Sequence, residues 1–199
     1  WEGVKWRPIT GAHSLMDETG NFPPCVWRGS MGDKTSLEDL DPPIEDVERE
    51  LRAQIELAQA RIHQVTHLSS HMGAATYRED LRTLVAALAQ EYGLPFEAEG
   101  ARPMDLPGGA ETPWQERLDL FLDALENLPP GYHVVVEHPG LDVPEMRAMG
   151  HPGYENVAAH RAGVTRIYTS ERVRNTIEDR GIRLVTYADL PPTGSSQEP

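Results

Sequence analysis

HVVVEHPG, residues 133–140, places a run of β-branched side chains directly before a polar turn. A continuous run of this kind is typical of a short strand buried on both faces, as in the parallel sheets of α/β proteins. The segment Glu137 to Gly140 then breaks the strand sharply. In parallel α/β folds the chemistry lies at the carboxyl ends of the strands, so His138 is a candidate functional residue.

A second stretch of the same kind is THLSSHMG, residues 66–73, which follows a short strand expected over residues 64–68. Histidine is the commonest metal ligand and the side chain best suited to proton transfer near neutral pH. Outside a helix, however, the spacing of His67 and His71 does not fix their rings together. From the residues alone, metal ligands and ordinary histidines in a polar turn both remain open. For Glu137, a helix cap, a solvated carboxylate and a catalytic group remain open as well.

The rest of the chain alternates between apolar helical patterns and short strand patterns. Helical spacing predicts helices over residues 44–62, 81–92 with Gly93 at the end, 118–128 before Pro129-Pro130, and 170–179. Strands are expected over residues 64–68, 94–98, 133–137 and 183–187, and loops over residues 1–43, 99–113 and 141–163, the last with some helix. Strands separated by helices indicate a parallel α/β sheet or barrel.

Composition limits the class of protein. The chain has 199 residues, 39% of them hydrophobic, and a formal net charge of −14, values that suit one globular domain with an acidic surface. Such a surface repels phosphate backbones and anionic lipid, so we expect neither nucleic acid nor a membrane as a partner. A single cysteine, Cys25, excludes an internal disulfide framework. The compartment cannot be read from these residues, and a homodimer stays open.

The eight histidines are not equally informative. Those outside the two motifs lack a strand-end position with polar neighbours, and we expect them to be surface or loop residues: His13, His63, His133, His151 and His160.

Four separated motifs occur in a fixed order: THLSSHMG, a helix ending in EYGLP, VVVEHPG, and the closing YTSERVRNTIEDRGIRLVTYADL. Taken together they resemble the YdjC-like (ChbG) carbohydrate deacetylase family, and the opening residues Trp1 to Phe22 are also similar to a segment of that family. The resemblance runs from Trp1 to about Leu190. It implies one domain over residues 1–190, followed by a disordered tail over residues 191–199.

The resemblance further implies an irregular (β/α) barrel of the polysaccharide-deacetylase type that binds one divalent metal ion, Mg²⁺ or Zn²⁺, and removes the acetyl group from an N-acetylated sugar. His71 matches a metal ligand of the family pattern. His138 matches a general acid for the leaving amine. His67, Ser70 and Glu137 match positions around the metal or the substrate.

The sequence also departs from the family pattern. The family's Asp-Asp-Phe-Gly motif, which supplies the metal aspartate, and its Gly-x-His-Leu motif, which supplies the first metal histidine, have no counterpart in these residues. Both motifs would lie before Trp1, so we expect a barrel that lacks its N-terminal strands here, in preference to a degraded relative. Ser69 stands where the family has Asp, and Glu137 stands where it often has Cys.

Two other functions remain open at this stage. A non-catalytic carbohydrate-binding barrel could use its tryptophans to stack on sugar rings, although tryptophan more often packs in a core; the four are Trp1, Trp6, Trp27 and Trp114. An amidase acting on non-sugar amides would use the same hydrolytic chemistry.

Overall fold

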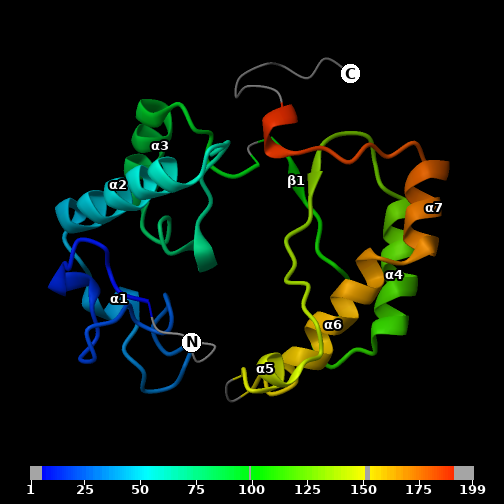
Figure 1. The fold of residues 1–199 in the computed structure, drawn as a ribbon, viewed down its shortest axis with the longest axis horizontal. Helices are drawn as coiled ribbons and strands as arrows, with labels where there is room; N and C mark the ends of the chain where they lie inside the picture. Colours follow the sequence, from blue (N-terminus) through cyan, green and yellow to red (C-terminus); the bar gives the residue numbers. More distant parts are fainter. Residues whose placement is uncertain (1–5, 99, 151–152, 191–199) are drawn as a thin grey trace. The chain divides into compact units, whose positions relative to one another are not determined.

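The structure is a computed structural model that describes residues 6–98, 100–150 and 153–190. It is a mixed α/β structure in which helices predominate (Figure 1). The described residues divide into two compact units, one made of residues 6–98 with residues 187–190 and the other of residues between 100 and 186. Trp1, His151 and the tail expected to be disordered over residues 191–199 lie outside the described residues.

The first unit is built on two helices that lie side by side, α2 (Ile44–Arg61) and α3 (Glu79–Tyr92). Arg78, just before α3, pairs with Asp41, just before α2, at 2.7 Å. Arg52, near the middle of α2, pairs with Glu91, near the end of α3, at 2.6 Å. The unit also contains four short helical segments: η1 (His13–Leu15), α1 (Leu37–Leu40), η2 (His71–Gly73) and η3 (Tyr187–Asp189).

Both long helices of this unit confirm the helical spacing in the sequence. Their apolar stripes meet in two small clusters, whose buried members are Leu15, Val47 and Leu81 in one and Ile55, Leu88 and Leu94 in the other. Gly93 ends α3 in the left-handed conformation, as its position after the apolar stripe predicts.

A buried carboxylate ties the irregular N-terminal residues to α2. Glu50 accepts hydrogen bonds from the amides of Ile9 and Thr10, at 3.0 and 2.9 Å, and from the Thr10 hydroxyl and Gln54. Burial raises the pKa of Glu50, but these donors together outweigh it and leave the pKa below its ordinary value of 4.5. The charged carboxylate is therefore the form that holds residues 9–10 against the helix.

The strands of the first unit are shorter than the sequence predicts. The segments expected over residues 64–68 and 94–98 meet in one parallel bridge between Leu68 and Phe96. The Leu68 amide donates to the Pro95 carbonyl at 2.8 Å, and the Glu97 amide donates to the Leu68 carbonyl at 2.7 Å. The parallel direction and the intervening helix α3 still give the β-α-β connection expected of an α/β protein.

The second unit repeats this connection. Strands β1 (Arg102–Pro103) and β2 (His133–Val134) are parallel, with Arg102 opposite His133, and α4 (Trp114–Glu126) connects them. Beside α4 lie α6 (Val157–Tyr168) and α7 (Glu171–Asp179), with the short helix α5 (Pro144–Arg147) packed on α6 (Figure 1). Their shared core consists of Leu106, Leu118, Phe121, Leu122, Leu125, Val164, Ile167 and Val173.

Three expectations about residues 100–187 are wrong. Residues 183–187 do not form a strand, and β1 lies in a segment expected to be loop. The helix expected somewhere within residues 141–163 is present as α5 and the first part of α6. The valine run is not buried on both faces, since Val136 is 73% exposed. Val136 lies beyond β2, whose paired residues are His133 and Val134. Of the helices in the described ranges, none is long and apolar enough to cross a lipid bilayer.

The core of the second unit predicts a clear difference between two aliphatic truncations. Ile167 is 0% exposed and Leu120 on α4 is 43% exposed. Ile167→Ala should lower the free energy of unfolding by about 2–5 kcal/mol, because a cavity remains where the side chain was. Leu120→Ala, the control, should change it by less than about 1 kcal/mol. Urea unfolding followed by circular dichroism measures both, and equal effects would contradict this assignment of the core.

Candidate functional site

The second histidine of THLSSHMG lies on an exposed turn of the first unit. His71 begins η2, and Met72 after it has φ +54°, a left-handed conformation that is uncommon outside glycine. The hydroxyl of Ser70 accepts a hydrogen bond from the Ala75 amide at 2.9 Å. Ser70 therefore closes the turn that presents His71 to the surface, a structural task that its residue type alone does not reveal.

The first histidine of the motif is held by its neighbours. The ring of His67 stacks on the ring of Tyr187 from the closing motif, with centroids 3.7 Å apart and planes parallel within 1°. Its Nδ1 atom lies 2.9 Å from the Thr66 hydroxyl. His67 is thus fixed in orientation, in contrast to the exposed His71.

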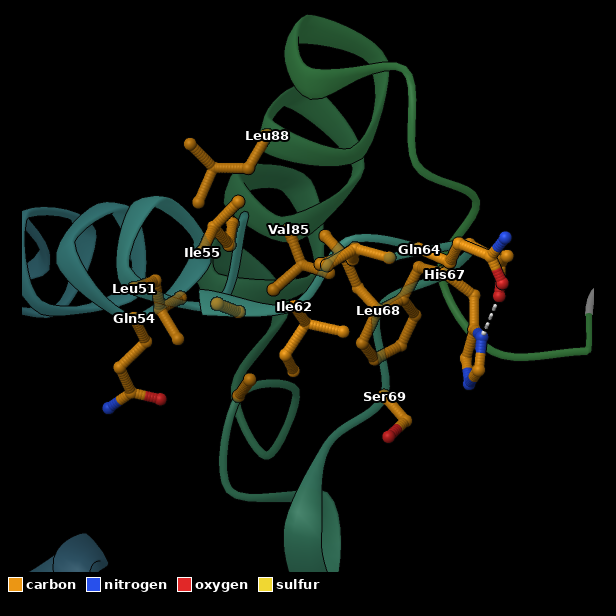
Figure 2. A pocket seen from close by; sticks show the side chains of 15 residues that line it. Leu51, Gln54, Ile55, Ile62, Gln64, His67, Leu68, Ser69, Val85 and Leu88 are labelled. Carbon is orange, nitrogen blue, oxygen red and sulfur yellow. Dashed lines mark hydrogen bonds between the residues drawn. The ribbon is translucent and has the colours of Figure 1, made fainter. Parts of the chain in front are cut away.

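A pocket of about 350 Å³ borders this motif (Figure 2). Figure 2 shows aliphatic side chains of α2 and α3 around it, including Ile55, Val85 and Leu88, while His67 lies at one side with its hydrogen bond to Thr66. Ten of its fifteen lining residues are apolar. The other five, Gln54, Gln64, Thr66, His67 and Ser69, carry hydrogen-bonding side chains, and three of these belong to the THLSSHMG motif.

In the second unit, the turn after β2 carries Glu137 and His138. Glu137 is not a solvated carboxylate: its Oε1 accepts a hydrogen bond from Nη2 of Arg117 at 3.1 Å, and its Oε2 accepts one from the His138 amide at 3.3 Å. Arg117, on α4, is 2% exposed. The imidazole of His138 itself is exposed. The structure therefore gives Glu137 a supporting position and leaves the histidine accessible to a substrate.

The same turn is anchored at its other end. The Gly140 amide donates to the Arg161 carbonyl at 3.2 Å, and the hydroxyl of Thr165 donates to the Gly140 carbonyl at 2.7 Å. A Cβ atom added to Gly140 would lie 3.1 Å from Cβ of Arg161 and 3.2 Å from Cε of Met146. A larger residue at position 140 would therefore press against Arg161 on α6 and Met146 on α5.

His160 is not the surface or loop residue expected from the sequence. It lies on α6, half-buried, with Nδ1 2.6 Å from the Tyr154 hydroxyl. Burial lowers the pKa of His160 first, and the charge of Arg117 lowers it further, while Glu137 opposes both. The neutral imidazole is therefore favoured beside the turn that carries His138. His133 likewise lies in β2, and its Nε2 contacts the Pro129 carbonyl at 3.0 Å.

The described residues do not form the metal site that the resemblance implies. No group of three or more His, Cys, Asp or Glu side chains within them is placed to hold a metal ion. His71 belongs to the first unit and His138 to the second. His71 alone provides one nitrogen ligand, whereas divalent metals take several ligands from the protein.

Comparison with known proteins places this arrangement in a family. The family model described as YdjC-like protein matches residues 2–179, which include both histidine motifs. The chain belongs to the YdjC-like family.

Two relatives of this chain carry names that state an activity. The carbohydrate deacetylase of Thermus thermophilus is 35% identical over 175 residues, covering 75% of this chain and 61% of its own length. Carbohydrate deacetylase 2 of Listeria innocua is 23% identical over 194 residues, covering 93% of this chain and 73% of its own length. The chain thus spans less than two thirds of the Thermus protein.

The fold also has a counterpart among solved structures of this type. A crystal structure described as a cellobiose-phosphate cleavage protein from Enterococcus faecalis superposes with a TM-score of 0.65 at 22% identity. The superposition covers 91% of this chain and 71% of the other. It supports the mixed α/β architecture.

The charges around His160 predict that two substitutions shift its pKa in opposite directions. In the wild type the pKa of His160 should lie below 6.5, so that folding stability decreases as the pH falls below 6.5 and the unfolded chain takes up the proton more readily. Arg117→Met removes a repelling charge and should raise this pKa. Glu137→Gln removes an attracting charge and should lower it. Histidine ring shifts measured by NMR against pH test both signs, and movement in the same direction would contradict the assignment.

Proposed function

We propose that this chain is a carbohydrate deacetylase that hydrolyses the acetamido group of an N-acetylated sugar. The observation that carries the proposal is the match of residues 2–179 to the YdjC-like family together with the 35% identity to a protein named carbohydrate deacetylase. Within the matched residues, Leu68 of the first motif pairs in a parallel bridge with Phe96, and His71 follows it in the chain. The second motif begins in β2, and His138 follows that strand. The carboxyl ends of parallel strands are the position at which α/β enzymes carry their chemistry. The proposal extends to an irregular (β/α) barrel as the complete architecture.

His138 is the residue proposed to transfer the proton. Cleavage of the amide bond leaves an amine nitrogen, which is a poor leaving group unless it is protonated as the bond breaks. The exposed imidazole of His138 sits on a turn that is held at both ends, by Arg117 through Glu137 and by Thr165 through Gly140. A proton donor fixed in this way can act on a substrate that approaches from solvent.

The charge of the chain bears on the substrate. With a formal net charge of −14, the protein repels phosphorylated sugars and attracts cationic amino sugars, and it does not oppose neutral ones. A neutral N-acetylhexosamine oligomer and its cationic deacetylated product both suit this surface.

The first test is an assay of acetate release from N-acetylglucosamine oligomers and, in parallel, from simple acetamides. The sugar should be cleaved and the acetamide should not. His138→Ala should reduce kcat by about 100-fold or more, the usual contribution of general acid catalysis. His13→Ala, which alters an exposed histidine on η1, is the control and should leave kcat unchanged. Cleavage of acetamides alone would favour an amidase, and sugar binding without hydrolysis would favour a binding protein, for which the 72% exposed Trp6 is a candidate contact.

The second test concerns the metal that we propose the enzyme requires, Mg²⁺ or Zn²⁺. His71→Ala should abolish binding of the ion, since His71 is the proposed ligand, whereas His67→Ala should weaken it modestly, since that ring is engaged by Tyr187. His63→Ala, an exposed histidine on the same unit, is the control. Isothermal titration calorimetry on the full-length protein measures all three. A larger loss for His67→Ala would exchange the two roles, and binding unaffected by every variant would contradict the proposal.

A further inference from the structure

Arg117 carries a full positive charge into the interior of the second unit. It is 2% exposed, and a buried guanidinium is stable only where acceptors compensate its lost hydration. Its Nη2 donates to Glu137 Oε1 at 3.1 Å and its Nε donates to the Pro107 carbonyl at 3.2 Å. Both acceptors come from segments outside α4, so the side chain connects its helix to two other parts of the chain.

These two segments follow the two parallel strands. Pro107 lies after β1 and Glu137 lies after β2, so Arg117 joins the carboxyl ends of both strands. The segment after β1 is packed closely on the arginine: a Cβ atom added to Gly108 would lie 2.9 Å from Cγ of Arg117. The carboxyl ends of parallel strands are where catalytic groups are placed in α/β enzymes.

The ion pair continues directly into the backbone of His138. Oε1 of Glu137 is engaged by Arg117, and Oε2 of the same carboxylate accepts the hydrogen bond from the His138 amide. A carboxylate held by a buried guanidinium has little rotational freedom, because both of its oxygens then have fixed partners. The position of the His138 backbone is thereby coupled to Arg117.

The other side of His138 is equally restricted. Pro139 has a fixed φ angle, and Gly140 is bound by α6 through the Arg161 carbonyl and the Thr165 hydroxyl. Between the anchored residues 137 and 140, rotation of the imidazole about its own side-chain bonds is the freedom that remains.

We propose that Arg117 is the positioning residue of the deacetylase reaction: it acts through Glu137 to hold the backbone of His138 where the imidazole meets the leaving amine. This inference rests on the proposed function. Arg117 does not touch the substrate, and its effect is confined to the step in which His138 acts.

The experiment compares three variants with a matched control. Arg117→Met removes the charge and keeps the length of the stem, Arg117→Lys keeps the charge, and Glu137→Gln keeps the size of the carboxylate. The substituted glutamine has one carbonyl oxygen, so it can accept from Arg117 or from the His138 amide but not from both. Arg172→Met is the control, because Arg172 pairs with Asp119 at 2.9 Å in the same unit with both side chains exposed.

Two readouts separate positioning from general stability. In Arg117→Met and Glu137→Gln the His138 amide proton should shift in the ¹H–¹⁵N spectrum and exchange with solvent about tenfold faster, since its acceptor is displaced. On N-acetylglucosamine oligomers, kcat should fall about tenfold or more while KM changes less than about twofold, because His138 acts on the leaving amine only in the transition state. Arg117→Lys should recover part of kcat, and Arg172→Met should change neither readout.

The outcomes are distinguishable. An unchanged His138 amide in folded Arg117→Met overturns the inference whatever the activity, and so does a rise in KM with kcat unchanged. If Arg117→Met fails to fold, Glu137→Gln decides by the same two readouts. If the wild type cleaves no N-acetylated sugar, the proposed function fails, and the amide measurement still decides whether Arg117 positions His138.

Discussion

The arrangement of the second unit depends on one buried charge, the guanidinium of Arg117. Removing a guanidinium from water costs several kcal/mol unless acceptors replace the lost hydration, so any fold that buries Arg117 must bring a carbonyl and a carboxylate to it. Here these are the Pro107 carbonyl and the Glu137 carboxylate. The requirement sets where the segments after β1 and β2 lie with respect to α4, and it therefore sets where the turn that carries His138 begins.

Helices and strands differ in how far this sequence predicts them. The stripes of α2, α3 and α4 are visible in the order of residues, because a helix is stabilised by contacts that recur along one face of the same segment. A strand is completed by a neighbour that is often distant in sequence. The valine run before Glu137 has the composition of a buried strand, yet only His133 and Val134 form β2, and Val136 beyond them is 73% exposed.

Helix α6 shows why the sequence predicts some helix within residues 141–163 but not where that helix begins and ends. It contains Gly163 and Thr165, which are weak helix formers, and its N-cap Asn156 makes no side-chain cap; the amide of that side chain donates instead to the Ala110 carbonyl at 2.9 Å. The helix is held by burial of Val164 and Ile167 against α4, a tertiary contact that local propensity does not record. The expectation of a surface position for His160 is wrong for the same reason, since its half-buried position follows from the helix that carries it.

The candidate site residues also differ in how far the sequence predicts their roles. The sequence identifies His67, His71 and His138 because histidine after a strand is a recognisable chemical signal. It does not distinguish the supporting roles of Ser70 and Glu137, because a hydroxyl that closes a turn and a hydroxyl that binds substrate are the same residue type. Arg117 gives no signal at all, since an arginine on an amphipathic helix is ordinarily exposed. A reactive imidazole must stay accessible and therefore cannot be fixed by its own burial. The rigidity that proton transfer requires has to come from neighbours that are buried, and in this unit the buried group is an arginine twenty residues before Glu137 in the chain.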